Sequence, residues 1–138
     1  MGAIEISGTL TLGDACGVSA CGSETGDTTI PLGFGGSCSR PAAVSAWIPS
    51  QAVASPAAFV TLPNVGPTAT VKQADFLYLR ANAAIEVRIT SDDGAGGQVV
   101  ALLPPTDFLM MTFSATRPLE LLEVRGTATI AYLVSGPS

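Results

Sequence analysis

Polar and apolar residues alternate along several short segments of the chain, the pattern of strands with one buried face. Near the N-terminus, "AIEISGTLTLG" places Ile4, Ile6, Leu10 and Leu12 on one face and polar residues on the other. The later segment "AIEVRIT" alternates in the same way. No segment has a convincing helical period. The pattern therefore predicts an all-β protein.

The C-terminal half is the most regular part of the pattern. Strand-like runs such as "DFLYLRA", "QVVALL", "DFLMMTFS" and "TATIAYLV" are separated by turn signals every 8–12 residues or so, the spacing typical of sandwiches and barrels. We expect one domain over residues 1–138, an antiparallel β-sandwich or jelly-roll-like fold. Residues 70–135 should form a regular β-meander.

The N-terminal third contains a long segment rich in Gly, Ser and Thr. Residues 13–41 predict an extended loop or arm, with a short strand around Thr28 to Leu32. Such long segments are uncommon in compact domains, and this one could order against a neighbouring subunit. Three cysteines lie here, Cys16, Cys21 and Cys38; they could be reduced, paired or metal-bound.

Prolines at positions 49, 56, 63 and 67 interrupt the next segment. We expect them to confine residues 42–67 to short strands, "AVSAWI" and "AAFVTL". A single tryptophan in such a run packs in the core or anchors an interface. The segment "DFLMMTFS" is so apolar that both of its faces could be covered. The candidate interface residues are Trp47, Phe59, Phe108 and Met110.

Composition indicates assembly with other protein chains. Charged residues make up 12% of the sequence and hydrophobic residues 47%, whereas an average soluble domain has about 25% charged residues. Contiguous exposed apolar area usually marks a contact surface, so we expect a homo-oligomer. The alternative is a bias towards Ala and Gly that raises apolarity without forming patches.

Charge and hydropathy exclude other partners. The net charge is −5, with one lysine and no basic patch, which argues against nucleic-acid binding. No run reaches the roughly 18 apolar residues of a membrane span. The segment "MGAIEISGTL" lacks a basic start and an apolar core, so no signal peptide is expected.

No residue set satisfies the requirements of a catalytic site. The chain has no histidine, the usual general base near neutral pH. The carboxylates that could act as a pair, Glu86, Asp107, Glu120 and Glu123, fall mostly on the polar faces of strands. We predict a protein that is not an enzyme and that uses no cofactor.

The stretch "SDDGAGG" joins two alternating segments. Asp92 and Asp93 with three following glycines have the chemistry of a hairpin loop of about five to seven residues, because Asp bonds nearby backbone and Gly accepts positive φ. The functional alternative is calcium, for which Asp92 and Asp93 are the candidate ligands. Calcium needs six to eight oxygens, and more distant acids would have to complete the set.

The segments "DFLYLRANAAIEVRIT" and "RPLELLEVRGTATIAYLV" resemble small all-β structural proteins of tailed-phage virions, of the decoration, head-fibre and tail-associated kind. The resemblance is a pattern of strands covering roughly Thr70 to Ser135; the N-terminal third has no counterpart. It implies a non-enzymatic virion component that forms a homo-oligomer and docks on a capsid or tail lattice, assembled in the host cytoplasm.

The competing hypothesis is a binding module of β-sandwich type, specific for carbohydrate or dependent on calcium. It would use loops and a stacking platform formed by Trp47, Phe59 or Tyr78.

Overall fold

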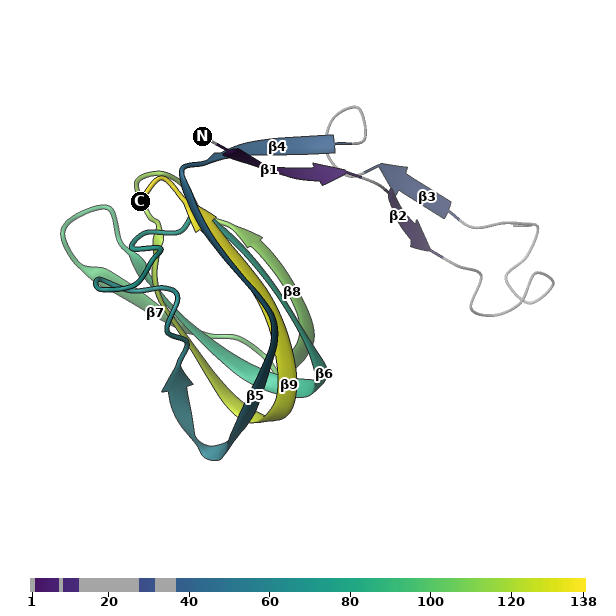
Figure 1. The fold of residues 1–138 in the computed structure, drawn as a ribbon, viewed down its shortest axis with the longest axis vertical. Helices are drawn as coiled ribbons and strands as arrows, with labels where there is room; N and C mark the ends of the chain where they lie inside the picture. The colour runs from purple at the N-terminus through teal and green to yellow at the C-terminus, as the bar shows by residue number, and fades with distance from the viewer. Residues whose placement is uncertain (1, 8, 13–27, 32–36) are drawn as a thin grey trace. The chain divides into compact units, whose positions relative to one another are not determined.

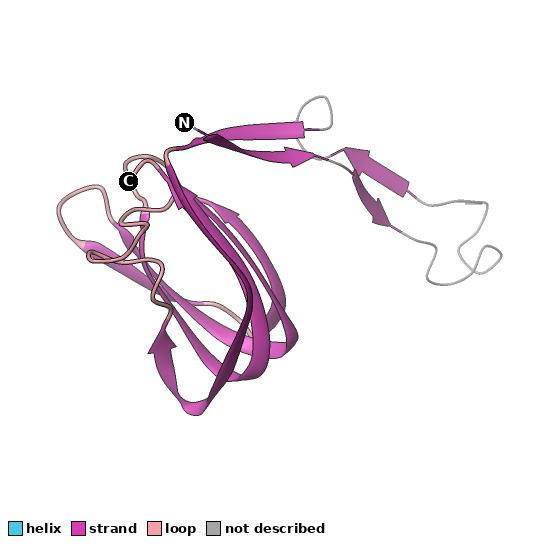
Figure 2. Ribbon diagram, in the orientation of Figure 1, coloured by secondary structure: helices cyan, strands magenta, loops and turns pink. Residues whose placement is uncertain are grey.

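All described secondary structure is β. The computed structural model describes the backbone of residues 2–7, 9–12, 28–31 and 37–138, and the side chains from residue 42 onward. Figure 2 shows strands and loops and no helix in these residues, which confirms the all-β prediction. None of them therefore forms a helix able to cross a membrane. The contacts divide the chain into two compact units, essentially Ala3–Arg40 and Pro41–Ser138.

The N-terminal strands form two small sheets. Strand β1 (Gly2–Ser7) pairs with β4 (Ser37–Ala42), and β2 (Thr9–Leu12) pairs antiparallel with β3 (Thr28–Pro31). These strands coincide with the alternating N-terminal segment and with the short strand expected around Thr28 to Leu32. Most of the expected loop over 13–41 and the side chains of the three cysteines lie outside the described residues.

Five strands form the sheet of the second unit. They are β5 (Val44–Thr61), β6 (Phe76–Asp92), β7 (Gln98–Leu102), β8 (Thr106–Thr112) and β9 (Leu119–Gly136). All pairs are antiparallel, in the order β5-β9-β6-β7, and β8 pairs with the other half of β6. In a simple meander each strand pairs with its neighbours in sequence, but here β9 lies between β5 and β6 (Figure 1).

The expectation that prolines break residues 42–67 into short strands was wrong for residues 44–61. Strand β5 runs through Pro49 and Pro56. It lies at the edge of the sheet, where a residue without an N–H group can face away from the ladder. Its register against β9 shifts between Ile48 and Gln51 and again between Ser55 and Val60, close to each proline. The prolines therefore cause irregularities in the strand without ending it.

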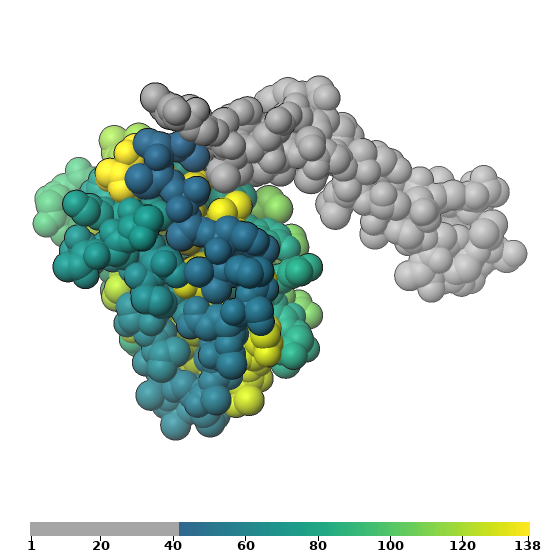
Figure 3. Space-filling model, viewed as in Figure 1, coloured from purple at the N-terminus to yellow at the C-terminus, as the bar shows by residue number. Residues whose placement is uncertain are grey.

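One face of the curved sheet carries the core. Alternate residues of the two long central strands point into the core. On β6 they are the odd-numbered residues from Leu77 to Ile89, and on β9 the even-numbered residues from Leu122 to Val134. Together with residues such as Val53, Leu62 and Val71 they form one apolar cluster. Figure 3 shows the atoms of the edge strand β5 in blue beside those of β9 in yellow.

A glycine marks the bend of β9. Gly126 has φ of +144°, a value that side-chain-bearing residues rarely adopt. A Cβ built there would lie 3.0 Å from Cγ2 of Ile85 on β6. The ladder between β6 and β9 is interrupted at the same level, between the pairs Ala81–Ile130 and Glu86–Arg125. The close approach and the bend both require glycine.

Candidate functional site

A row of large side chains crosses the outer face of the sheet. Trp47 on β5 lies opposite Leu133 on β9, Leu133 lies opposite Tyr78 on β6, and Tyr78 lies opposite Met110 on β8. Residues paired in this way point to the same face. Because the neighbouring positions Ile48, Leu79 and Leu109 pack on the core, this row points away from it.

Phe108 extends the row towards the next rung. Its ring meets that of Tyr78 edge-on, with centroids 5.8 Å apart, and Tyr78 lies 6.4 Å from Trp47 at an angle of 42°. These five residues are called the aromatic row below. Trp47, Phe108 and Met110 are 49%, 55% and 41% exposed. Single exposed apolar residues are ordinary, but a contiguous cluster marks a contact surface.

The structure brings three of the four predicted interface residues together. Trp47, Phe108 and Met110 belong to the aromatic row, and Tyr78, which links them, was considered only as a stacking residue. Phe59 lies apart, on another part of the outer face. The sequence contains the alternation that points these residues outward. It does not contain the insertion of β9 that aligns β5 with β6.

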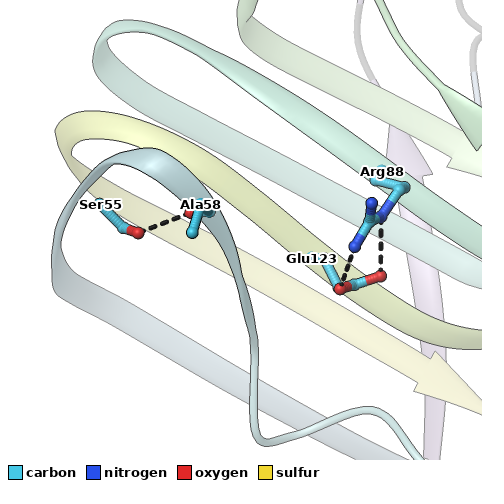
Figure 4. A network of polar contacts seen from close by, with 4 residues as sticks. All are labelled: Ser55, Ala58, Arg88 and Glu123. Carbon is cyan, nitrogen blue, oxygen red and sulfur yellow. Dashed lines mark hydrogen bonds and ion pairs between the residues drawn. The ribbon is translucent and has the colours of Figure 1, made fainter.

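Phe59 interacts with arginines of its own chain. The guanidinium carbons of Arg88 and Arg125 lie 4.2 Å and 4.4 Å from the centre of its ring, within the range of a cation–π contact. Arg88 donates to both carboxylate oxygens of Glu123 at 3.0 and 2.6 Å (Figure 4). Arg125 donates to Glu86 from Nε at 2.6 Å and also from its terminal nitrogen.

These four charged residues form two rungs of the β6–β9 ladder. Glu86 is paired with Arg125, and Arg88 with Glu123, so each rung joins opposite charges across the strands. The hydrogen bond with Glu123 raises the pKa of Arg88 above its ordinary value. This charged cluster orders the middle of the outer face. Its carboxylates are already engaged by cations, which removes Glu86 and Glu123 as free acids.

A third carboxylate from the sequence, Glu120, accepts a hydrogen bond from the side-chain amide of Gln98 at 2.7 Å. It lines an open groove of about 610 Å³ together with Lys72 and Gln73. Of the four carboxylates considered as catalytic pairs, three therefore bond other side chains. Among the residues with described side chains, no group of three His, Cys, Asp or Glu could hold a metal ion.

Asp92 and Asp93 lie at the hairpin between β6 and β7, as the turn chemistry predicted. The backbone N–H of Gly94 donates to Asp92 Oδ1 at 2.6 Å. Asp93 Oδ1 accepts from Ala95 at 2.7 Å and from Gly97 at 2.9 Å. These two hydrogen bonds, first that from Ala95, lower the pKa of the Asp93 carboxyl, with a smaller contribution from the charge of Arg117.

The glycines of this loop have the backbone that the turn needs. Gly94 and Gly96 have φ of +79° and +88°, values that favour glycine. The two aspartates thus use one oxygen each to bond the N–H groups of their own turn. This geometry explains the stretch "SDDGAGG" without a bound ion.

Comparison of the chain with protein-family models, with curated proteins and with solved structures gave no match.

Proposed function

We propose that this chain is a non-enzymatic structural subunit that assembles with other protein subunits, of the kind found in phage virions, and that the aromatic row is its contact surface. The observation that carries the proposal is the row of Trp47, Tyr78, Phe108, Met110 and Leu133 on one sheet face, in which Trp47, Phe108 and Met110 are exposed. Its virion setting rests on the resemblance of residues 70–135. On this proposal the row docks on a neighbouring copy or on the lattice.

The chemistry of the row suits a protein partner. Aromatic residues and Met are enriched in interface cores, and truncating a central Trp or Tyr commonly weakens binding strongly. The five residues of the row are uncharged, and Arg80, which is paired with Phe108 on the same face, lies beside them. A partner that covers Phe108 should therefore leave the Arg80 guanidinium in water or offer it a carboxylate.

A carbohydrate-binding module is the second candidate, because the exposed Trp47 could stack on a sugar. Ring geometry makes it weaker: Trp47 and Tyr78 are inclined at 42°, and Tyr78 and Phe108 at 82°. A flat stacking platform needs rings that are nearly coplanar. Inclined rings instead present a ridged surface that suits interdigitating protein side chains.

Absolute mass in solution tests the proposal. Light scattering after size exclusion, over a range of concentrations, should give a defined oligomer or particle well above the 13.9 kDa of one chain. The variant Trp47→Ser with Phe108→Ser should reduce that mass. Both side chains are half-exposed, so the variant should keep its circular dichroism spectrum.

Val60→Ser removes a partly exposed apolar side chain of β5 outside the row and should leave the mass unchanged. A wild-type protein that stays a folded monomer at high concentration overturns the proposal. Dissociation by a calcium chelator, or a rise in melting temperature with an oligosaccharide, favours the binding-module function.

A further inference from the structure

Strand β7 forms a free edge of the sheet in the described part of the chain. It pairs only with β6, through Arg88–Leu102 to Asp92–Gln98. Its sequence is "QVVAL", without a charged residue or proline. Val100 and Leu102 are 60% and 58% exposed, and Val99 is also exposed. A bare apolar edge strand is a template for pairing with another strand.

The register shows which backbone groups face outward. Leu103 N–H donates to Val87 and Asp93 N–H donates to Gly97, so these two pairs are hydrogen-bonded pairs of the β6–β7 ladder. Such pairs alternate with pairs that are not hydrogen-bonded. The residues between them on β7, Gln98, Val100 and Leu102, therefore direct their N–H and C=O groups away from β6, to the free edge.

The other edges of the sheet carry features that hinder strand pairing. On β8 the hydroxyl of Thr106 accepts from Phe108 N–H at 3.2 Å and donates to Phe108 C=O at 2.7 Å. These are outward backbone groups, and Asp107 adds a charge beside them. On β5, Pro49 and Pro56 and two register shifts interrupt the edge. Prolines, charges and irregularities are the usual devices against edge pairing, and β7 has none of them.

We propose that β7 pairs antiparallel with β7 of a second copy of this chain, about a twofold axis at Val100, to make one continuous sheet. This register places Val100 opposite its own copy and Gln98 opposite Leu102 of the partner. All three outward-facing residues then form hydrogen-bonded pairs, about six bonds in all. The neutral strand meets its copy without like charges, which favours a second copy as the occupant. Val100 and Leu102 of both copies continue each other's apolar stripe.

This proposal uses a different surface from the aromatic row, so the two are tested separately. The self-pairing of Val100 gives a sharp experiment. Val100→Lys places two ammonium groups opposite each other at the axis, and Val100→Glu places two carboxylates there; each should raise the dimer dissociation constant about tenfold or more. An equimolar mixture of the two variants should restore a heterodimer, because opposite charges then meet at the axis.

The measurement is light scattering after size exclusion at matched concentrations, with one variant tagged to identify the heterodimer. Ala54→Lys, on the exposed side of β5, adds the same charge away from β7 and should leave the mass unchanged. Circular dichroism and the melting temperature confirm that each variant folds, which the exposure of Val100 favours. If a charged variant did not fold, Val100→Thr, which keeps the volume, together with Leu102→Thr replaces it.

The outcomes separate the two proposals. A wild-type mass that falls with Val100→Lys and recovers in the mixture supports the β7 pairing. A mass that Val100→Lys leaves unchanged, or a mixture that forms no heterodimer, overturns the β7 pairing, and the aromatic-row variant then decides the proposed function alone. A wild-type dimer that responds to Val100→Lys but not to the aromatic-row variant overturns the row instead. A wild-type monomer at high concentration overturns both.

Discussion

At the scale of single residues, Gly126 holds the bend of β9. Its φ of +144° strains any other residue, and a β-carbon would lie only 3.0 Å from Cγ2 of Ile85, so this side chain would have to shift. We expect Gly126→Ala to lower the free energy of unfolding by about 1–3 kcal/mol, the usual cost of a residue held in such a region. Chemical denaturation monitored by circular dichroism measures it. Thr127→Ala, at the exposed neighbouring position, is the control; an equal effect of both variants would contradict this role.

Asp93 gives the hairpin loop a pH dependence. Its pKa is lowered in the folded protein, chiefly by the N–H groups of Ala95 and Gly97. A lowered pKa means that the carboxylate stabilises the fold above the ordinary pKa of the group and that this contribution is lost as the pH falls through the folded value. Asp93→Asn should therefore melt below the wild type at pH 7.

The difference in melting temperature between the wild type and Asp93→Asn should shrink as the pH approaches 3. Thermal melts of both proteins between pH 7 and pH 3 check it, with Asp107→Asn on the edge strand as the matched loss of one charge. A difference that stays constant over this range would mean that the turn does not depend on the carboxylate.

Local chemistry made these residue features partly predictable. The aspartates and glycines of "SDDGAGG" require a turn whatever lies around them, and the turn is where that stretch predicted it. Gly126 carries no such signal, because its need for glycine comes from Ile85, 41 positions earlier in the chain. The hydrogen bond of 2.8 Å from Asn64 to the buried Tyr132 also joins residues far apart in the sequence, so no local signal predicts it.

At the scale of elements, Phe59 ties β5 to the two central strands. It contacts both guanidiniums of the charged cluster from the edge strand, so its removal should loosen β5 and expose the rungs to water. We expect Phe59→Ala to lower the melting temperature by about 3–8 °C. Phe59→Leu keeps most of the apolar area and should cost less, which isolates the aromatic part.

Introducing Arg125→Met into the wild type and into Phe59→Ala gives a double-mutant cycle for the contact between Phe59 and Arg125. A coupling indistinguishable from zero would show that Phe59 acts only by covering apolar surface. Since Phe59 is engaged within its own chain, Phe59→Leu should also leave the solution mass of the assembly unchanged. A loss of assembly in that variant would return Phe59 to the contact surface.

The strands themselves were predictable because alternation is a local property, whereas their order was not. Period and turn residues identified strand segments within β6, β7, β8 and β9. They did not show that "DFLYLRA" and "AIEVRIT" belong to one continuous strand, β6. The insertion of β9 between β5 and β6 depends on which faces bury most area together, and that is decided by the whole sheet. The approach of Trp47 to Tyr78 depends on this insertion, which explains why Trp47 was singled out but not seen to lie beside Tyr78.

At the scale of the whole molecule, the apolar residues of the second unit lie partly in the core and partly on the surface. Many of them are buried on one face of the sheet, and others are exposed on the aromatic row and on β7. A low proportion of charged residues is expected of a subunit that has the proposed contact surfaces as well as a core. Both surfaces belong to the same unit, so they should function without residues 3–40.

Among the residues with described side chains, every buried member of the apolar cluster lies between Val53 and Val134. A fragment of residues 41–138 should therefore unfold cooperatively, with a melting temperature within about 5 °C of the full chain. Calorimetry of both proteins measures this. A fragment of residues 41–118, which lacks the central strand β9, should not fold. If the fragment of residues 41–138 melted without cooperativity, the sheet would need the N-terminal strands, and the two units would be one folding domain.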